Sequence, residues 1–151
     1  MGIDHDIHQS KFRNEYQRAG VNLLFTYGWV MERTKELFAS EDITPQQFNI
    51  LRILRGSHPQ PLSTLQIRER MLDKMSDTSR IVDRLIAKGL LKKGTCKTDR
   101  RLVDVMITDK GKKLLERLDE RQDELDKIVG NLTEEEAATL SKLLDKIRGS
   151  E

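Results

Sequence analysis

Residues 63–89 read STLQIRERMLDKMSDTSRIVDRLIAKG, and they hold two short helical patterns separated by a few residues. Ser63 is placed to cap the first helix, and Ser76 is placed to cap the second. The second segment carries its apolar residues on one face and ends at Gly89, a residue typical of helix C-termini. Two short helices joined by a tight turn predict a helix-turn-helix.

A further helix is predicted immediately upstream, in the segment DITPQQFNILRILRG at residues 42–56. Thr44 is a candidate N-cap, and Gln47 stands three residues later, as a capping box requires. Gly56 is expected to follow the last turn. The helix-turn-helix is therefore preceded by a third, well-delimited helix.

Two strand-like runs follow, at residues 90–95 and 101–108, and the second alternates apolar and polar residues as a half-buried strand does. The order helix, helix, strand, strand after a capped helix is that of a winged helix. In that fold the second helix of the pair enters the major groove of DNA, and the hairpin reaches an adjacent minor groove.

Long helices are predicted at both ends of the chain, over residues 10–38, 109–129 and from Thr133 to about residue 148. Their apolar stripes have no obvious core of their own, which favours burial against a second copy of the chain. The predicted fold is mainly α with a small β-hairpin wing: a winged helix-turn-helix with N- and C-terminal dimerisation helices. The expected division is a dimerisation helix at 1–43, a DNA-binding region at 44–108 and C-terminal dimerisation helices at 109–151, all in one intertwined domain.

The net charge of +2 hides a regional asymmetry. Residues 44–108 contain thirteen Lys or Arg against six Asp or Glu, whereas the rest of the chain contains fourteen against nineteen. A basic middle flanked by acidic ends is typical of a nucleic-acid reader carried on a separate scaffold.

Several classes of function are disfavoured. The single cysteine, Cys96, excludes an internal disulfide, and the three histidines show no metal-ligand spacing. No Gly-rich phosphate loop or Ser/His/Asp grouping is present, so neither an enzyme nor a bound cofactor is expected. Without an apolar run of membrane-spanning length or a signal-peptide pattern, a cytoplasmic protein with no membrane partner is expected.

Three segments, TPQQFNILRIL, SRIVDRLIAKGLLKK and DRRLVDVMITDKG, resemble the MarR family of bacterial winged-helix regulators. The resemblance covers roughly residues 44–118 and is looser in the outer helices. It implies a homodimer that binds double-stranded DNA at a palindromic operator, a repressor that a small aromatic or acidic effector releases.

The resemblance also implies which residues contact DNA. The recognition helix would run from about Ser76 to Lys88, with its exposed early residues facing base edges and phosphates. Asp77 could instead support the helix N-terminus, and Arg84 could pair with the neighbouring Asp83. The DNA-contacting residues implied in this helix are Ser76, Asp77, Thr78, Ser79, Arg80 and Arg84.

In the loop between the strands, the family's Asp-x-Arg pattern falls on Asp99 and Arg101. By this resemblance Arg101 enters the minor groove while Asp99 orients its guanidinium, because a bidentate carboxylate contact fixes the plane of the arginine. Lys97 and Arg100 would meet phosphates.

Three aromatic residues of the first long helix, Tyr16, Tyr27 and Trp29, could line an effector cleft or simply pack in an interface or core. Two other functions remain open. One is a winged-helix protein-interaction module without DNA affinity, which has no reason to keep Arg101 exposed. The other is a thiol-based redox-sensing regulator, which rests on Cys96 alone.

Overall fold

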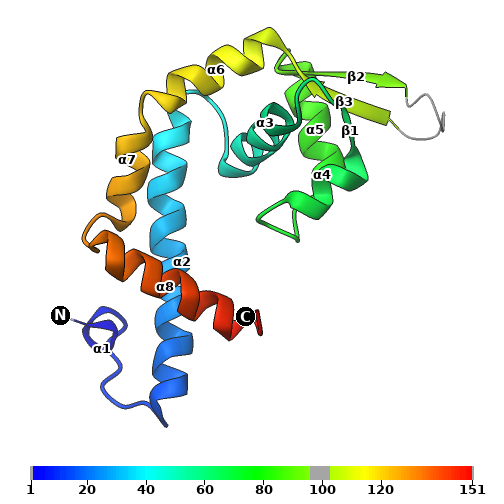
Figure 1. Cartoon of the computed structure of the whole chain (residues 1–151). Helices are drawn as coiled ribbons and strands as arrows, with labels where there is room; N and C mark the ends of the chain where they lie inside the picture. Colours follow the sequence, from blue (N-terminus) through cyan, green and yellow to red (C-terminus); the bar gives the residue numbers. More distant parts are fainter. Residues whose placement is uncertain (1, 96–102, 151) are drawn as a thin grey trace.

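The computed structural model describes residues 2–95 and 103–150. This part of the chain is largely helical, with one small antiparallel sheet (Figure 1). The elements are α1 (Ile3–Asp6), α2 (Glu15–Ala39), α3 (Pro45–Ser57), β1 (Leu62–Ser63), α4 (Thr64–Arg70), α5 (Thr78–Ala87), β2 (Leu91–Thr95), β3 (Val103–Ile107), α6 (Asp109–Asp119), α7 (Gln122–Asp126), the 3₁₀ turn η1 (Lys127–Val129) and α8 (Glu134–Ile147).

Local capping defines the helices of the winged lobe, which comprises α3 to β3. At the start of α3, Thr44 accepts a hydrogen bond from the Gln47 amide and the Gln47 side chain accepts one from the Thr44 amide, each 3.1 Å long. Ser63 and Gln66 form the same capping box at α4. Both predicted caps are confirmed.

The end of α5 is also the predicted one. Gly89 has φ +76°, the left-handed conformation that glycine adopts without strain. The amide of Leu90 donates to the carbonyl of Leu85 at 3.0 Å, and the amide of Gly89 donates to that of Ile86 at 2.9 Å. These two bonds form a Schellman motif, which turns the chain from α5 directly into β2.

The sheet has three strands in the order β1-β3-β2, all antiparallel. Leu91 pairs with Ile107 and Thr95 with Val103, so β2 and β3 form the predicted hairpin. The strand β1, whose Leu62 pairs with Val105, was not predicted. A strand of two residues shows no alternation, and its existence depends on β3 being available to pair with it.

The hydrophobic core lies in the winged lobe and at its junction with α6. It brings together side chains of α3, α4, α5, both long strands, the buried face of α6 and the end of α2. Its fully buried large members are Phe38, Ile50, Leu51, Leu54, Ile67, Leu85, Val105 and Leu115.

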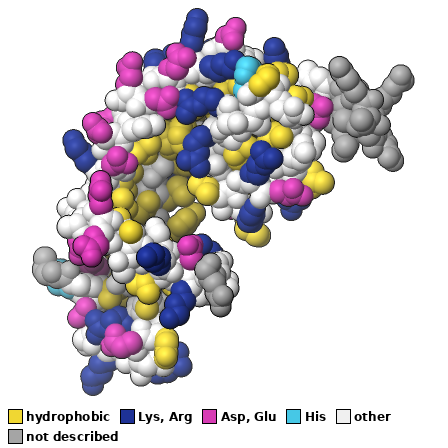
Figure 2. Space-filling model, viewed as in Figure 1, with side chains coloured by type: hydrophobic (Ala, Val, Ile, Leu, Met, Phe, Trp, Pro, Cys, Tyr) yellow, Lys and Arg dark blue, Asp and Glu magenta, His cyan; other side chains and the backbone are white. Residues whose placement is uncertain are grey.

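The helical arm, made of α2, α7, η1 and α8, extends away from this lobe (Figure 1). The helix α6 connects the sheet to α7, which runs beside the C-terminal half of α2, and α8 passes across α2 in this view. Of the 25 residues of α2, only Phe38 is buried, and α8 has no buried residue. Figure 2 shows hydrophobic side chains exposed in the hollow between the winged lobe and the arm.

The structure corrects three helix boundaries. The first long helix begins at Glu15 rather than residue 10, because the side chain of Asn14 accepts the Gln17 amide at 2.9 Å and caps it there. The helix α3 continues through Gly56 to Ser57 rather than stopping before it.

The third correction concerns the helix predicted over residues 109–129, which is interrupted. After α6, Arg121 leaves the helical conformation with φ −108° and ψ 17°. Its guanidinium bonds to Ser40 at the end of α2 and to Glu124. This break directs α7 along α2. A contact between segments distant in the sequence therefore interrupts a helix that the sequence pattern predicts to be continuous.

Candidate nucleic-acid interface

The helix α5, which the sequence resemblance implies to be the recognition helix, is capped by Asp77. The Asp77 carboxylate accepts the amide of Arg80 at 3.3 Å. The prediction that Ser76 is the N-cap is wrong, because the Ser76 amide donates to the Asp73 carbonyl at 3.2 Å and belongs to the preceding turn. Asp77 therefore supports the helix N-terminus, the structural role weighed for it from the sequence.

Replacing Asp77 with alanine is expected to destabilise the protein by about 1 kcal/mol, the usual effect of removing a carboxylate N-cap. Asp77→Ser should retain most of the stability because a serine hydroxyl also caps. Urea unfolding at fixed protein concentration measures the change. Asp83→Ala is the matched control, because Asp83 is exposed on the same helix and its replacement removes the same charge. Equal destabilisation by both alanine variants would contradict the capping role.

One face of α5 is polar and exposed. It carries Ser79, Arg80, Asp83 and Arg84, while Val82 and Leu85 on the opposite face are buried. The expectation that Thr78 is exposed is wrong: its side chain is only 4% exposed. Thr78, Val82 and Leu85 are spaced four and three residues apart, so Thr78 lies on the buried face of the helix.

Arg84 shows no ion pair with Asp83 in the part of the chain that the structure describes. Adjacent residues of a helix point in different directions, so this pair is poorly placed to form. The guanidinium of Arg84 is therefore available on the exposed face of α5.

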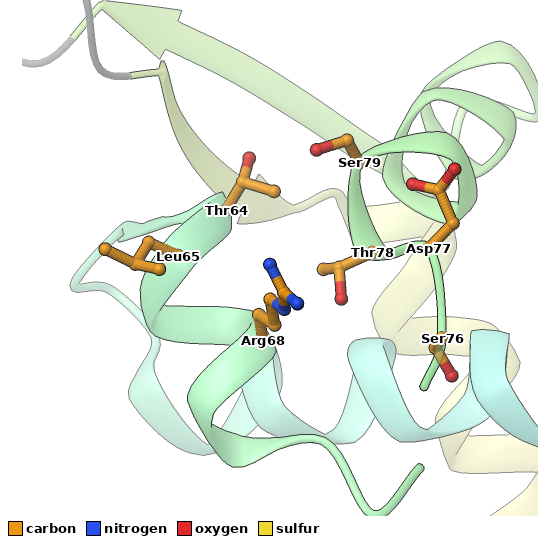
Figure 3. A pocket seen from close by; sticks show the side chains of 7 residues that line it. All are labelled: Thr64, Leu65, Arg68, Ser76, Asp77, Thr78 and Ser79. Carbon is orange, nitrogen blue, oxygen red and sulfur yellow. The ribbon is translucent and has the colours of Figure 1, made fainter. Parts of the chain in front are cut away.

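A hollow of about 430 Å³ lies between α4 and the start of α5 (Figure 3). The guanidinium of Arg68 points into it from α4, opposite the first turn of α5. The hydroxyls of Ser76 and Thr78 have no hydrogen-bond partner among the described residues. The hollow is lined by Thr64, Leu65, Arg68, Ser76, Asp77, Thr78 and Ser79.

Arg68 was not predicted from the sequence as a candidate site residue. The available signal was the spacing of Thr64 and Arg68, four residues apart on the first helix of the pair, which places them on one face. A guanidinium beside hydroxyl groups and a helix N-terminus is a chemical environment suited to an oxyanion.

The predicted contacts of the loop between β2 and β3 lie outside the described residues. These are Lys97, Asp99, Arg100 and Arg101, and Cys96 lies outside them as well. Thr95 and Val103 pair at one end of the hairpin, and Leu91 and Ile107 pair at its other end, next to the start of α6.

The three candidate effector residues are not brought together. Tyr16 is 88% exposed, and it precedes Tyr27 by eleven residues, about 16 Å along a helix. Trp29 alone lies beside a cavity, a volume of about 410 Å³ between α2 and α7. The guanidinium of Arg33 stacks on the Trp29 ring, 3.6 Å from its centroid.

Ion pairs join α6 to α3 and to the segment that follows α2. Arg55 of α3 holds Asp119 of α6 through two hydrogen bonds of 2.7 and 3.2 Å. The Arg117 guanidinium donates hydrogen bonds to the Glu41 carboxylate, and these bonds raise the pKa of Arg117. The Arg121 guanidinium donates a hydrogen bond to Glu124 and lowers the pKa of that carboxyl. Charged contacts thus attach α6 to α3 and to the segment after α2, and a further ion pair lies at the start of α7.

Within residues 2–95 and 103–150, no cluster of His, Cys, Asp or Glu has the grouping of a metal site. Over the same ranges, no helix combines the length and apolar character that crossing a membrane requires.

A helix-turn-helix followed by an antiparallel hairpin, with a polar face on its second helix, defines a winged-helix protein. The model of the MarR family matches residues 41–102. The chain is 31% identical over 106 residues to the HTH-type transcriptional regulator MhqR of Bacillus subtilis, covering 70% of this chain and 72% of that protein. It is 32% identical over 108 residues to the multiple antibiotic resistance protein MarR of Salmonella typhimurium, covering 70% and 74%. The chain belongs to the MarR family of transcriptional regulators.

Solved structures agree with this assignment. A cysteine-to-serine mutant of MarR from E. coli, complexed with operator DNA, is similar with a TM-score of 0.78 and 26% identity, covering 91% of this chain and 99% of that one. A MarR transcription factor from Planctomyces limnophilus has a TM-score of 0.69 and 34% identity, covering 89% and 98%. The resemblance noted in the sequence and the predicted winged-helix fold are both confirmed.

Proposed function

We propose that this chain is a cytoplasmic, homodimeric repressor that binds a palindromic operator in double-stranded DNA and is released by a small molecule. The observation that carries the proposal is the capped helix α5, which directs Ser79, Arg80 and Arg84 outward. A positively charged helix face of this kind fits the major groove, where arginine makes bidentate contacts with guanine.

The hollow beside α5 supplies the second part of the interface. Arg68 would meet a phosphate of the DNA backbone there, together with Thr64 and Ser79 at its edges. Phosphate contacts position a protein on the duplex and base contacts specify the sequence. In this proposal Arg68 therefore contributes to affinity for all sequences, and Arg80 and Arg84 to the choice between them.

The helical arm supports the homodimer. Apolar side chains of α2 and α8 are exposed in the single chain, among them Leu24 at 74% and Ile147 at 67%. Extended apolar surface of this kind marks an interface. The proposed division therefore remains a dimerisation helix at 1–43, a DNA-binding region at 44–108 and C-terminal dimerisation helices at 109–151.

Selection of bound duplexes from a random pool tests the function directly. A dimer should enrich a palindrome whose half-sites are about 34–36 Å apart, or a multiple of this distance. Titration of the enriched duplex and of a scrambled duplex at the same salt concentration then measures specificity. Failure to enrich any sequence would favour the protein-interaction module instead.

The effector site proposed for the single chain is the cavity beside Trp29. Three cations, Arg33, Arg121 and Lys127, line it with the indole ring. Two acids, Glu36 and Glu124, line it as well, and Glu124 pairs with Arg121, so the lining keeps one net positive charge. This chemistry suits a small aromatic acid, which would release DNA by binding one separation of the two recognition helices better than the other. Tyr16 and Tyr27 remain candidates only as parts of a site completed by the second copy.

Substitutions of Asp99 and Arg101 test the proposed DNA contacts of the hairpin loop. Arg101→Ala should weaken operator binding by roughly 1–3 kcal/mol, the range for a good groove contact. Asp99→Ala should weaken it as well, although it removes a negative charge near phosphates. If Asp99 orients Arg101, the double mutant loses less than the sum of the two single mutants. Fluorescence anisotropy at two salt concentrations measures all three variants.

Lys97→Ala is the matched control for a simple phosphate contact. It should weaken binding to all sequences alike and reduce the salt dependence by about one phosphate contact. Tighter binding by Asp99→Ala, with an effect independent of Arg101→Ala, would show that the loop acts only through its net charge.

A further inference from the structure

Two polar side chains of α3 are buried in the winged lobe. Gln47 is 6% exposed and Asn49 is 4% exposed. The Gln47 side chain accepts a hydrogen bond from Thr44 in its own helix cap. The Asn49 Oδ1 atom instead accepts the backbone amide of Leu72, 23 residues later in the sequence, at 2.8 Å. Asn49 thus ties α3 to the turn of the helix-turn-helix.

Leu72 is the first residue after the C-cap of α4. Met71 at that cap is extended, with φ −67° and ψ 140°, so the chain leaves the helix there. The turn then folds on itself, because the Asp73 carboxylate accepts the Met75 amide at 2.9 Å and the Asp73 carbonyl accepts the Ser76 amide. These bonds shape the turn but do not attach it to the rest of the lobe.

Apolar packing does not hold the outer part of this turn either. The side chain of Leu72 is 80% exposed and that of Met75 is 92% exposed. The hydrogen bond that the Leu72 amide donates to Asn49 therefore attaches the chain to α3 between the buried Met71 and the start of α5. This hydrogen bond lies in the segment that determines the direction of α5 relative to α4.

We propose that Asn49 is a positioning residue for DNA recognition, which orients α5 by holding the backbone of Leu72. The inference rests on the proposed DNA-binding function. Base contacts require correct placement of the helix, whereas attraction to phosphates tolerates displacement. Without the acceptor, the Leu72 amide loses its partner, and a smaller fraction of the protein has α5 in the binding position.

Asn49→Leu removes the acceptor at nearly constant size, whereas Asn49→Asp keeps an acceptor oxygen in either protonation state. Gln47→Leu is the matched control, because it also removes a buried polar side chain of α3 but leaves the Leu72 contact intact. Two quantities are measured for each variant. One is the ratio of affinities for the selected operator and a scrambled duplex, and the other is amide hydrogen exchange at Leu72 by NMR.

Asn49→Leu should lower the affinity ratio at least about tenfold and speed exchange at Leu72, because the buried donor is left unpaired. Asn49→Asp should keep the slow exchange and restore most of the ratio. Gln47→Leu should lower thermal stability without changing either quantity. An equal loss of the ratio in Asn49→Leu and Gln47→Leu would assign the effect to general destabilisation and overturn the inference.

The outcomes separate this inference from the function on which it rests. A wild-type protein that prefers no duplex over the scrambled one would overturn the proposed function together with this inference. A wild-type protein that discriminates, with an Asn49→Leu variant that discriminates equally well, would overturn the positioning role alone.

Discussion

Replacing Gly111 with alanine is expected to destabilise the protein by about 3 kcal/mol, a large overpacking effect. A Cβ atom at this position would lie 2.5 Å from the carbonyl oxygen of Leu90 and 2.7 Å from Cγ1 of Ile107. The Leu90 oxygen cannot move away without weakening the hydrogen bond that it accepts from the Thr108 amide at 3.1 Å. The close approach of α6 to the sheet therefore requires glycine.

Gly56→Ala is the control for this substitution. Gly56 lies in α3, and the position that an added Cβ atom would take is open space. Alanine should therefore stabilise the protein by roughly 0.5–1 kcal/mol through helix propensity. Urea unfolding at one protein concentration compares both variants with the wild type. If Gly111→Ala unfolded at the same urea concentration as the wild type, the close packing of α6 on β3 would be contradicted.

Deletion of residues 133–151 is expected to abolish dimerisation and lower operator affinity by at least about a hundredfold, because binding of two linked half-sites is lost. The deletion removes α8, whose Leu140, Leu143 and Ile147 are 42%, 54% and 67% exposed in the single chain. Sedimentation velocity reports the oligomeric state, and fluorescence anisotropy with the selected operator reports the affinity.

Deletion of residues 149–151 alone is the matched control, since it shortens the same terminus and leaves α8 complete. Circular dichroism checks that the longer deletion retains the winged lobe. A truncated protein that sediments as a stable monomer and binds the full operator with native affinity would contradict the proposed role of α8.

Much of the candidate site could be predicted from the sequence. The position of α5, its exposed Arg80 and Arg84 and the hairpin behind it all follow from apolar spacing and capping residues within a few positions. The errors at this site are Ser76 as the cap and Thr78 as an exposed residue. Both concern a shift of one position at a helix start, where Ser76, Asp77 and Thr78 are all residues that cap helices.

Arg68 and Asn49 were not recognised from the sequence as parts of the candidate site. Each belongs to an amphipathic helix, where an arginine is ordinarily solvated and an asparagine is ordinarily exposed. Arg68 gains significance only because α5 begins opposite it, and Asn49 only because the amide of Leu72 comes within 2.8 Å.

The elements whose causes are local can be predicted from the sequence alone. The capping boxes at Thr44 and Ser63, the helix end at Gly89 and the alternating strand β3 depend on residues near one another in the chain, so pattern and composition are sufficient. Tertiary contacts cause the break at Arg121, the pairing of β1 with β3 and the attachment of the turn between α4 and α5 to α3. These features arise from hydrogen bonds between segments distant in sequence, whose free energy exists only once the chain has folded.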